Sequence, residues 1–309
     1  MAALVETMFY VRETPWHGLG TRVEHALASK DALRYSGLTW RVRQEDIKTV
    51  DGHPIQGFRA NVRDDNNAVL GVVSDRYKVV QNSDAFAFTD NLLGEGVTYE
   101  TAGSLCGGKR VWLLARLPEQ YKLLGEEITP YLVFTNSHDG SGAIRVAATP
   151  VRVVCNNTLN LALNTAKRSW SVAHKGDIQR KLDKARNTIF MAEKYMKHLQ
   201  DEAERLSMIR LSDKMVLNWM DELLPIPENA SAQQEKNILH QRKDMQHRYF
   251  DAPDLVALPK SGWRFINAVS DYATHTEPLR KTAQYKENLF SKTMDGHPLI
   301  DQAMKFLAA

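Results

Sequence analysis

The chain has 309 residues, of which 43% are hydrophobic and 25% are charged, and its formal net charge at pH 7 is +3. These values are typical of a globular protein with one large core or two modest ones. Residues 1–150 carry 16 Lys or Arg and 18 Asp or Glu, a net charge of −2, and the remainder carries +5. This asymmetry is far below that of a histone or another tail-binding protein.

The two cysteines, Cys106 and Cys155, occur in no Cys-x-x-Cys arrangement, which excludes a zinc ribbon and a disulfide scaffold. The N-terminus lacks a basic start followed by an apolar stretch, so we expect no signal peptide. The sequence contains no run of about eighteen apolar residues that could cross a bilayer. We therefore expect a cytoplasmic protein that does not associate with membranes.

The first elements are a short helix and a hairpin. Ser29–Ser36 is expected to be helical, with Ser29 as its cap. Trp40–Val50 and Pro54–Arg63 alternate apolar and polar residues on either side of Asp51-Gly52, a strong signal for a β-hairpin. Two antiparallel strands are therefore predicted before residue 64.

A longer strand, a helix and a second antiparallel meander follow. Val69–Val80 is expected to be a strand that breaks near Asp75, and Asn82–Leu93 has the spacing of a helix. The strands of the second meander are predicted at Val97–Thr101, Arg110–Leu117 and Tyr131–Thr135.

The turn His138–Gly142 precedes another predicted strand, Ala143–Cys155. Asn156, Asn157 and Thr158 then offer helix caps ahead of an apolar helical stretch. This part of the chain therefore predicts a β-β-β-α core in which strands lead directly into a capped helix.

From Asp177 onward the periodicity is helical. Apolar residues recur every three or four positions over Asp177–Leu206, which predicts one amphipathic helix of about 30 residues. Ser212 is expected to cap a helix that Pro225 stops. Further helices are predicted at Gln234–Tyr249, Trp263–Tyr272 and Pro298–Leu307. The predicted fold class is α+β, with an α+β domain over 1–174 and a helical oligomerisation or partner-binding region over 175–309.

Positive charge concentrates after the strand–helix unit. Residues 166–197 contain nine Lys or Arg against three Asp or Glu, a net charge of +6. Such a distribution favours a polyanion over a small neutral substrate. The plainer interpretation is a sheet edge and a solvated helix face.

Binding a polyanion would require cations that follow phosphates along an extended strand and aromatic rings that stack on bases. The first candidates lie on or just after the strand–helix unit: Arg145, Arg152, Lys167, Arg168 and Lys175. The second group lies at predicted strand ends: Arg76, Lys78, Lys109 and Arg110. Trp170, between Arg168 and Lys175, is the best candidate for stacking.

Two other classes of function stay open. A Cys/His enzyme could be assembled from His17, His138, Asp139 and Cys155, although a buried structural role suits Cys155 and a turn role suits His138-Asp139. His240 and His247 lie seven apart without a carboxylate pattern, and no phosphate-binding loop, HExxH or dinucleotide motif is present. We expect a non-enzymatic protein without cofactor or metal. An interaction protein that uses the long helix is the alternative.

Four segments carry a family resemblance. They are PWHGLG at 15–20, GVVSDRYKVVQN at 71–82, DGSGAIRVAATPVRVVCNNTLNLAL at 139–163 and GWRFINAVSDY at 262–272. Together they resemble the phage/plasmid-like proteins grouped as domain of unknown function 932, over about residues 8–275. That family implies an origin in phages, prophages or conjugative plasmids, but no defined activity.

The predicted β-β-β-α core is also similar in topology to the single-strand annealing proteins, namely the eukaryotic Rad annealing mediator and the phage Redβ, RecT and Erf types. That similarity implies a cationic groove for single-stranded DNA, rings or filaments of subunits, and strand annealing without a nucleotide cofactor. The expected partners are single-stranded DNA and further copies of the chain.

Overall fold

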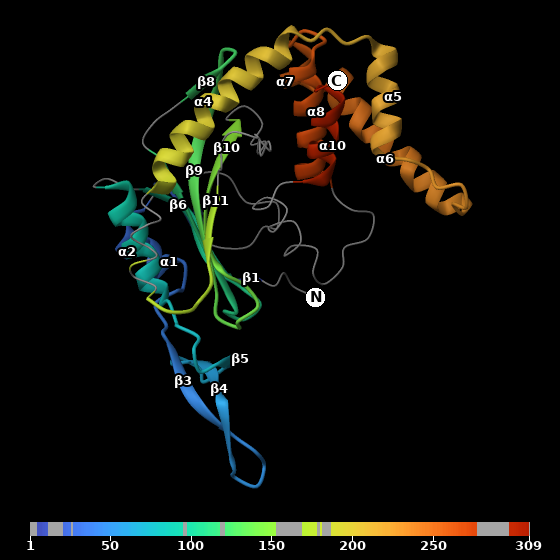
Figure 1. The fold of residues 1–309 in the computed structure, drawn as a ribbon. Coiled ribbons are helices and arrows are strands. Elements are labelled where there is room, and N and C mark those ends of the chain that lie inside the picture. Colours follow the sequence, from blue (N-terminus) through green and yellow to red (C-terminus); the bar gives the residue numbers. More distant parts are fainter. Residues whose placement is uncertain are drawn as a thin grey trace. The chain divides into compact units, whose positions relative to one another are not determined.

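The computed structural model of the protein describes residues 5–11, 21–25, 27–94, 98–117, 121–152, 169–177, 180, 187–276 and 297–308. The fold class is α+β, as predicted, with most strands in the first half of the chain and most helices in the second (Figure 1). The residues form two compact units. One, here called the sheet unit, comprises 1–118, 131–148 and 167–193; the other, the helical unit, comprises 119–130, 149–166 and 194–309.

The larger sheet has eight described strands in the order β11-β10-β9-β7-β6-β1-β2, with β8 paired to β9. Every pair with a described register is antiparallel except β1 with β2. The bounds are β1 Val5–Val11, β2 Thr21–Val23, β6 Thr98–Leu105, β7 Arg110–Arg116, β8 Tyr121–Leu123, β9 Glu126–Ser137, β10 Ile144–Arg152 and β11 Ser169–Val172.

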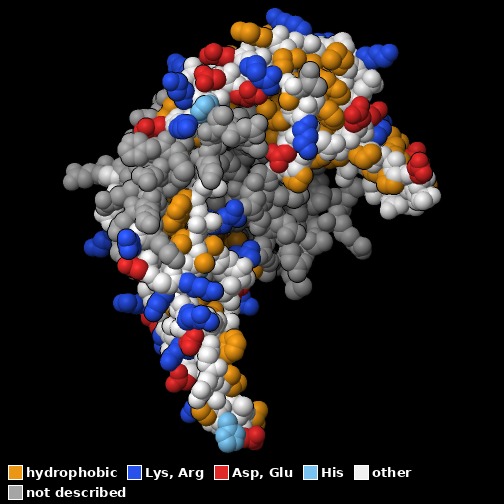
Figure 2. All heavy atoms as spheres, viewed as in Figure 1, with side chains coloured by type: hydrophobic (Ala, Val, Ile, Leu, Met, Phe, Trp, Pro, Cys, Tyr) orange, Lys and Arg blue, Asp and Glu red, His pale blue; other side chains and the backbone are white. Residues whose placement is uncertain are grey.

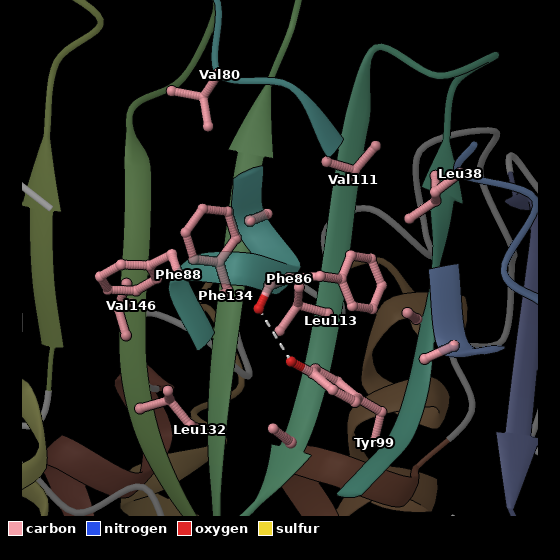
Figure 3. Packing of buried hydrophobic residues seen from close by; sticks show 14 of the residues in the cluster. Leu38, Val80, Phe86, Phe88, Tyr99, Val111, Leu113, Leu132, Phe134 and Val146 are labelled. Carbon is pink, nitrogen blue, oxygen red and sulfur yellow. Dashed lines mark hydrogen bonds between the residues drawn. The ribbon is translucent and has the colours of Figure 1, made fainter. Parts of the chain in front are cut away.

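Two helices, α1 (Ser29–Tyr35) and α2 (Asn82–Leu93), pack on one face of this sheet (Figure 1). Phe86 and Phe88 of α2 lie against Tyr99, Leu113 and Phe134 of the strands (Figure 3). The Tyr99 hydroxyl lies 3.2 Å from the Phe86 carbonyl oxygen, and burial raises the pKa of Tyr99. Because β-strand residues alternate between faces, the apolar residues at alternate positions form one continuous core.

A smaller sheet of three antiparallel strands projects from the sheet unit (Figure 1). It consists of β3 (Val42–Lys48), β4 (Pro54–Arg63) and β5 (Val69–Ser74). The predicted turn at Asp51-Gly52 joins β3 to β4, and Gly52 has a φ of 84°, a conformation that favours glycine. The predicted hairpin is therefore confirmed.

The helical unit is organised around a second apolar core. Its helices are α4 (Asn187–Met208, in this unit from Lys194), α5 (Asp213–Leu223), α6 (Ala232–Asp251), α7 (Pro253–Val256), α8 (Gly262–His275) and α10 (Pro298–Phe306). Leu199 and Leu206 of α4 and Trp263 of α8 are fully or almost fully buried in it. Arg264 is also buried, and donates to the carbonyl oxygens of Tyr249 (2.9 Å) and Leu258 (3.0 Å).

Several element boundaries differ from the sequence predictions. Ser29 is the first helical residue of α1 rather than its cap; Ala28, in an extended conformation, takes that position. Helix α6 begins two residues earlier than predicted, because Ser231 and Gln234 form a capping box. Strands β1, β2, β8 and β11 were not predicted. Strands β2, β8 and β11 have only three or four residues, too few to show a periodicity. Strand β1 has seven, but its apolar residues Met8–Val11 are consecutive and do not alternate with polar ones.

Other predicted helices and caps are confirmed or lie outside the described residues. Helix α2 has the predicted bounds, and Ser212 caps α5 by accepting from the amide of Met215 at 3.3 Å. The helix expected after Asn156 lies outside the described residues. Of the long helix expected over 177–206, the structure describes residues 177, 180 and 187–206, and 187–206 lie in helix α4. Within the described ranges, no helix combines the length and apolar character needed to cross a membrane.

Candidate functional site

Several buried polar residues lie at the end of the larger sheet where β9 leads into β10. The loop His138–Gly142 connects the two strands. Asp139 Oδ1 accepts from the Ser141 amide at 2.9 Å and from the Ser137 hydroxyl at 2.6 Å. Burial alone would raise the pKa of Asp139, but these hydrogen bonds and the nearby charge of Arg110 outweigh burial and lower it. The predicted turn role of Asp139 is confirmed.

Strand β5 and the chain that follows it pack directly on this loop. A Cβ on Gly71 would lie 2.7 Å from the Asp139 Cα, so only glycine fits at this position. The Tyr77 hydroxyl donates to the Ser137 carbonyl, and Asn61 Nδ2 of β4 donates to the His138 carbonyl at 2.6 Å. The motif segments 71–82 and 139–142, far apart in the sequence, therefore form one structural unit.

His138 lies at the centre of this unit and is completely buried. Its Nε2 is 3.0 Å from Asn82 Oδ1, whose amide nitrogen donates to the carbonyls of Leu38 and Trp40. Asn82 Oδ1 must therefore accept, and His138 Nε2 carries the proton. Burial, with a smaller effect of His174, lowers the pKa of His138 to about 3, so the imidazole is neutral at physiological pH.

A second histidine joins the segment after β11 to the segment after β5. His174 Nδ1 donates to the Lys78 carbonyl at 2.8 Å, and the Lys78 amide donates to the His174 carbonyl at 2.9 Å. Its ring stacks on Tyr77 at a centroid distance of 4.4 Å. Burial lowers the pKa of His174. Two neutral imidazoles thus hold this end of the sheet.

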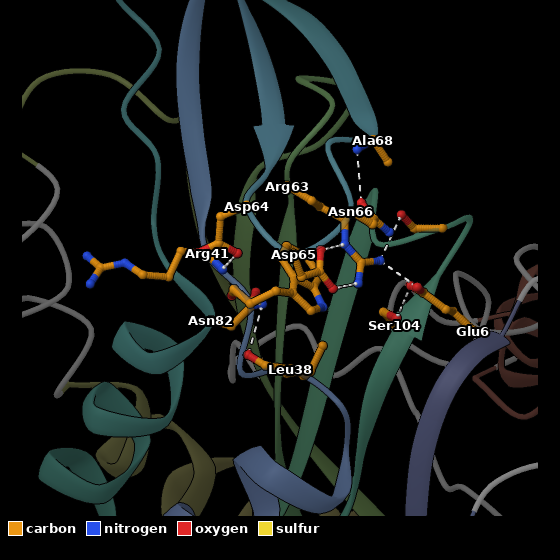
Figure 4. Close-up of polar contacts among 12 residues, drawn as sticks. Glu6, Leu38, Arg41, Arg63, Asp64, Asp65, Asn66, Ala68, Asn82 and Ser104 are labelled. Atoms are coloured by element: carbon orange, nitrogen blue, oxygen red, sulfur yellow. Dashed lines mark hydrogen bonds and ion pairs between the residues drawn. The ribbon is translucent and has the colours of Figure 1, made fainter.

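Charged side chains form further contacts where the smaller sheet joins the larger one. Arg63 forms ion pairs with Glu6 and with Asp65, and its guanidinium lies 4.3 Å from the centroid of the Trp40 ring (Figure 4). Burial lowers the pKa of Arg63, but the two carboxylates outweigh burial and raise it. The Arg41 amide donates to Asp64 Oδ1 at 2.8 Å (Figure 4).

Six of the predicted cations lie at or near this sheet end. Lys109 ends the β6–β7 connection and Arg110 begins β7. The His138 amide donates to the Lys109 carbonyl at 2.7 Å, and Arg110 Nη2 is 3.4 Å from the Ser141 hydroxyl oxygen. Lys78 is joined to His174, and Lys175 is the next residue in the chain. Arg76 follows β5, and Arg145 is the second residue of β10.

The arginines at positions 110 and 145 share one face of the larger sheet. Their neighbours Val111, Ile144 and Val146 face the core, so alternation places both arginines on the face opposite α1 and α2. Arg76, Lys78, Lys109 and Lys175 are exposed. In the space-filling view, Lys and Arg side chains gather where the smaller sheet meets the larger one (Figure 2).

The other predicted site residues do not join this group. Trp170 pairs in register with Val146, and its ring packs, partly buried, against the apolar core, on the face opposite Arg145. Arg152 ends β10, but its side chain lies outside the described residues, as do Lys167 and Arg168.

The candidate residues for an enzyme are only partly described. His17 and Cys155 lie outside the described residues, and the protonated nitrogen of His138 is committed to Asn82. His247 Nδ1 is 2.9 Å from Asp251 Oδ2 on the surface of α6. Among the described side chains, no group of three or more His, Cys, Asp or Glu could hold a metal ion.

The polar residues that build the site were not among the sequence predictions. Asn61, Asn82, Asn136 and His174 are buried and bond to backbone groups of other segments. Asn82 belongs to GVVSDRYKVVQN, so this motif contained a usable signal. In it, Gln81 and Asn82 directly follow the apolar residues Val79 and Val80, at the start of helix α2.

The family model described as Domain of unknown function (DUF932) matches residues 69–293, which is well over half of the chain, and the protein therefore belongs to this family. The matched range contains both motif segments that meet at the sheet end. Comparisons with curated proteins and with solved structures found no match.

Proposed function

We propose that the protein binds single-stranded DNA without sequence preference and promotes the annealing of complementary strands, without a nucleotide cofactor. The observation that carries this proposal is the gathering of cations from separate segments around the loop 138–142. Lys78, Lys109 and Lys175 come from three different parts of the chain, and all are exposed. Exposed cations on a rigid support can follow a phosphate backbone, which is the main requirement for sequence-independent binding.

The rigidity of the support strengthens the proposal. The backbone beside each of these lysines is held by buried groups: His138 bonds to Lys109, and His174 bonds to Lys78 and precedes Lys175. Such anchoring lowers the entropy lost when a flexible strand is bound, because the protein side is already ordered. The resemblance to phage/plasmid-like proteins also supports the proposal, because mobile elements often encode their own recombination proteins.

Assembly into a ring or filament is part of the same proposal. The long amphipathic helix was predicted to mediate oligomerisation or partner binding, but the burial of helix α4 gives that prediction little support. Tyr195, Leu199, Ala203 and Leu206, which form its apolar stripe, are completely buried within the helical unit. A helix that buries its apolar face in its own unit does not need a partner to cover it. Self-assembly would therefore use another surface.

The proposal is tested by fluorescence anisotropy with a labelled oligonucleotide at several salt concentrations. Replacing Lys78, Lys109 and Lys175 together by Ala should weaken binding strongly at low salt. It should also reduce the slope of log K against log salt by about 2, since each phosphate contact on a single strand contributes about 0.7. Strand annealing, followed by energy transfer between labelled complementary strands, should fall in parallel.

The matched control replaces three exposed lysines of the helical unit, Lys214, Lys236 and Lys243, by Ala. The net charge changes by the same amount, so a loss of long-range attraction alone would affect both variants equally. Absence of saturable binding by the natural protein at micromolar concentration would refute the proposal. Equal losses of DNA affinity in the two variants would show that the sheet end is not the binding site.

A further inference from the structure

Apolar side chains on one face of the smaller sheet are more than half exposed. Phe58 of β4 is 51% exposed and Val72 of β5 is 58% exposed. The register pairs Ala60 with Val72, so Phe58, Ala60 and Val72 lie on one face, here called the apolar face. The opposite face carries Asn61 and Val73, which are buried.

Strand β5 forms one edge of this sheet. Among the described residues it pairs with β4 only. The Asp75 amide donates to the Gly57 carbonyl at 3.0 Å, and hydrogen-bonded and non-hydrogen-bonded pairs alternate along an antiparallel ladder. With Val73 paired to Arg59 and Val72 to Ala60, the peptide groups of Val72 therefore point away from β4, toward the open edge.

The two edges of the sheet differ in charge. Strand β3, at the other edge, carries Arg43, Glu45, Asp46 and Lys48, the kind of charged sequence that discourages pairing with another strand. Strand β5 has the sequence VLGVVS, without a charged residue or a proline. An uncharged, valine-rich edge with exposed side chains is a template for strand addition.

We propose that the open edge of β5 pairs with β5 of a second copy of this chain, antiparallel and about a two-fold axis at Val72. This inference goes beyond DNA binding and does not depend on it. The pairing places Val72 beside Val72 of the other copy and continues the apolar face from one copy to the next. The result is a six-stranded sheet shared by two molecules, with an isologous interface.

Charge favours a second copy as the occupant. Two-fold pairing of β5 brings no like charges opposite each other, whereas β3 paired about its centre would oppose Glu45 to Glu45. Asp64 and Asp65 precede β5, while Arg76 and Lys78 follow it after Asp75. An antiparallel arrangement turns the net positive end of each strand toward the net negative end of the other.

The first test measures mass by light scattering at micromolar protein. The natural chain should have at least twice the 35.0 kDa of one copy, and Val72→Lys should halve that mass. Val50→Lys is the matched control, because Val50 is fully exposed in the β3–β4 turn and the charge change is the same. The control should keep the mass of the natural chain. Circular dichroism should show that both variants are folded.

The second test is a cross-link. Hydrogen-bonded partners across an antiparallel ladder have Cα atoms about 5.5 Å apart, within the range of a disulfide. Val72→Cys should therefore give a covalent dimer under mild oxidation, whereas Val50→Cys and the natural chain should not. A monomeric natural chain, an assembly whose mass Val72→Lys leaves unchanged, or cross-linking no stronger at position 72 than at position 50 would each overturn the proposal. Recovery of a monomer bound to a different protein through this edge would do the same.

Discussion

The sheet end and the core of the helical unit use buried polar groups in different ways. At the sheet end, segments 38–41, 77–81 and 138–143 belong to no helix or strand, and side chains form hydrogen bonds with their backbone groups. Asn82, for example, donates to Leu38 and Trp40, and Asn136 donates to Val80. In the helical unit most backbone groups are satisfied within the helices, and polar side chains act mainly at helix ends, as Arg264 does on the carbonyl of Tyr249.

This difference follows from the cost of burying a peptide group without a hydrogen-bond partner. Segments outside helices and strands lack regular backbone partners, so side chains must supply the hydrogen bonds. Some buried side-chain atoms stay unpaired in both regions. Among the described residues, no hydrogen-bond partner is found for Trp40 Nε1, Asn136 Oδ1, His138 Nδ1 and His174 Nε2 at the sheet end, or for the Tyr249 hydroxyl and Trp263 Nε1 in the helical unit. The sheet end differs because two of its groups are imidazoles, and burial lowers the pKa of both. The sheet end should therefore respond to pH and to loss of single polar groups, whereas the helical core should respond mainly to loss of volume.

The largest effect is expected in the helical core. Trp263 is 1% exposed, and Trp263→Ala should lower the free energy of unfolding by about 3–5 kcal/mol through lost burial and the cavity left behind. Urea denaturation followed by circular dichroism measures this. Trp263→Phe is the control: it keeps most of the ring and removes an indole N–H that has no partner among the described residues, so its cost should be clearly smaller.

Mild acid should destabilise the sheet end by a similar but smaller amount. The folded pKa of His138, about 3, lies below its ordinary value of 6.5, so the unfolded chain binds more protons between these pH values and stability falls as pH falls. From pH 6.5 to pH 4 the loss from His138 alone should be about 3 kcal/mol. Denaturation midpoints measured across this range should have a smaller slope in His138→Gln. An unchanged slope would contradict a buried neutral His138.

Removal of one polar side chain at the sheet end should cost less. Asn61→Ala leaves the buried His138 carbonyl without its donor, and we expect a loss of about 2 kcal/mol. The comparison variant is Asn237→Ala on α6, where the side chain only accepts from Gln233. Thermal melting of both proteins tests this, and equal shifts would mean that the sheet end does not depend on its side-chain hydrogen bonds.

The smallest effect is expected at a helix end. Ser212 accepts from the Met215 amide at the start of α5, and Ser212→Ala should cost about 1 kcal/mol. Ser212→Asp should restore the cap and, with its charge near the positive helix end, recover the stability. If Asp does not recover what Ala loses, the hydroxyl has a role other than capping.

By itself, the sequence determined those elements whose signals are local. The hairpin around Asp51-Gly52, helix α2 and the cap at Ser212 were predicted from residue spacing and turn chemistry, because hydrophobic periodicity and capping depend on neighbours within a few positions. The same local patterns predicted the α+β class. The cations at 76, 78, 109, 110, 145 and 175 could be named as candidates from the sequence, but their common location at the sheet end could not.

Only the tertiary structure decided which of these residues meet. Lys78 lies beside His174 because backbone groups almost a hundred positions apart in the sequence pair with each other, and no local pattern specifies such a partner. Burial likewise decided that His138 is a neutral structural group, that Trp170 packs on the core, and that the stripe of α4 is covered within its own unit. Side-chain chemistry can be read along the chain, but its environment is set by whatever distant segment packs against it.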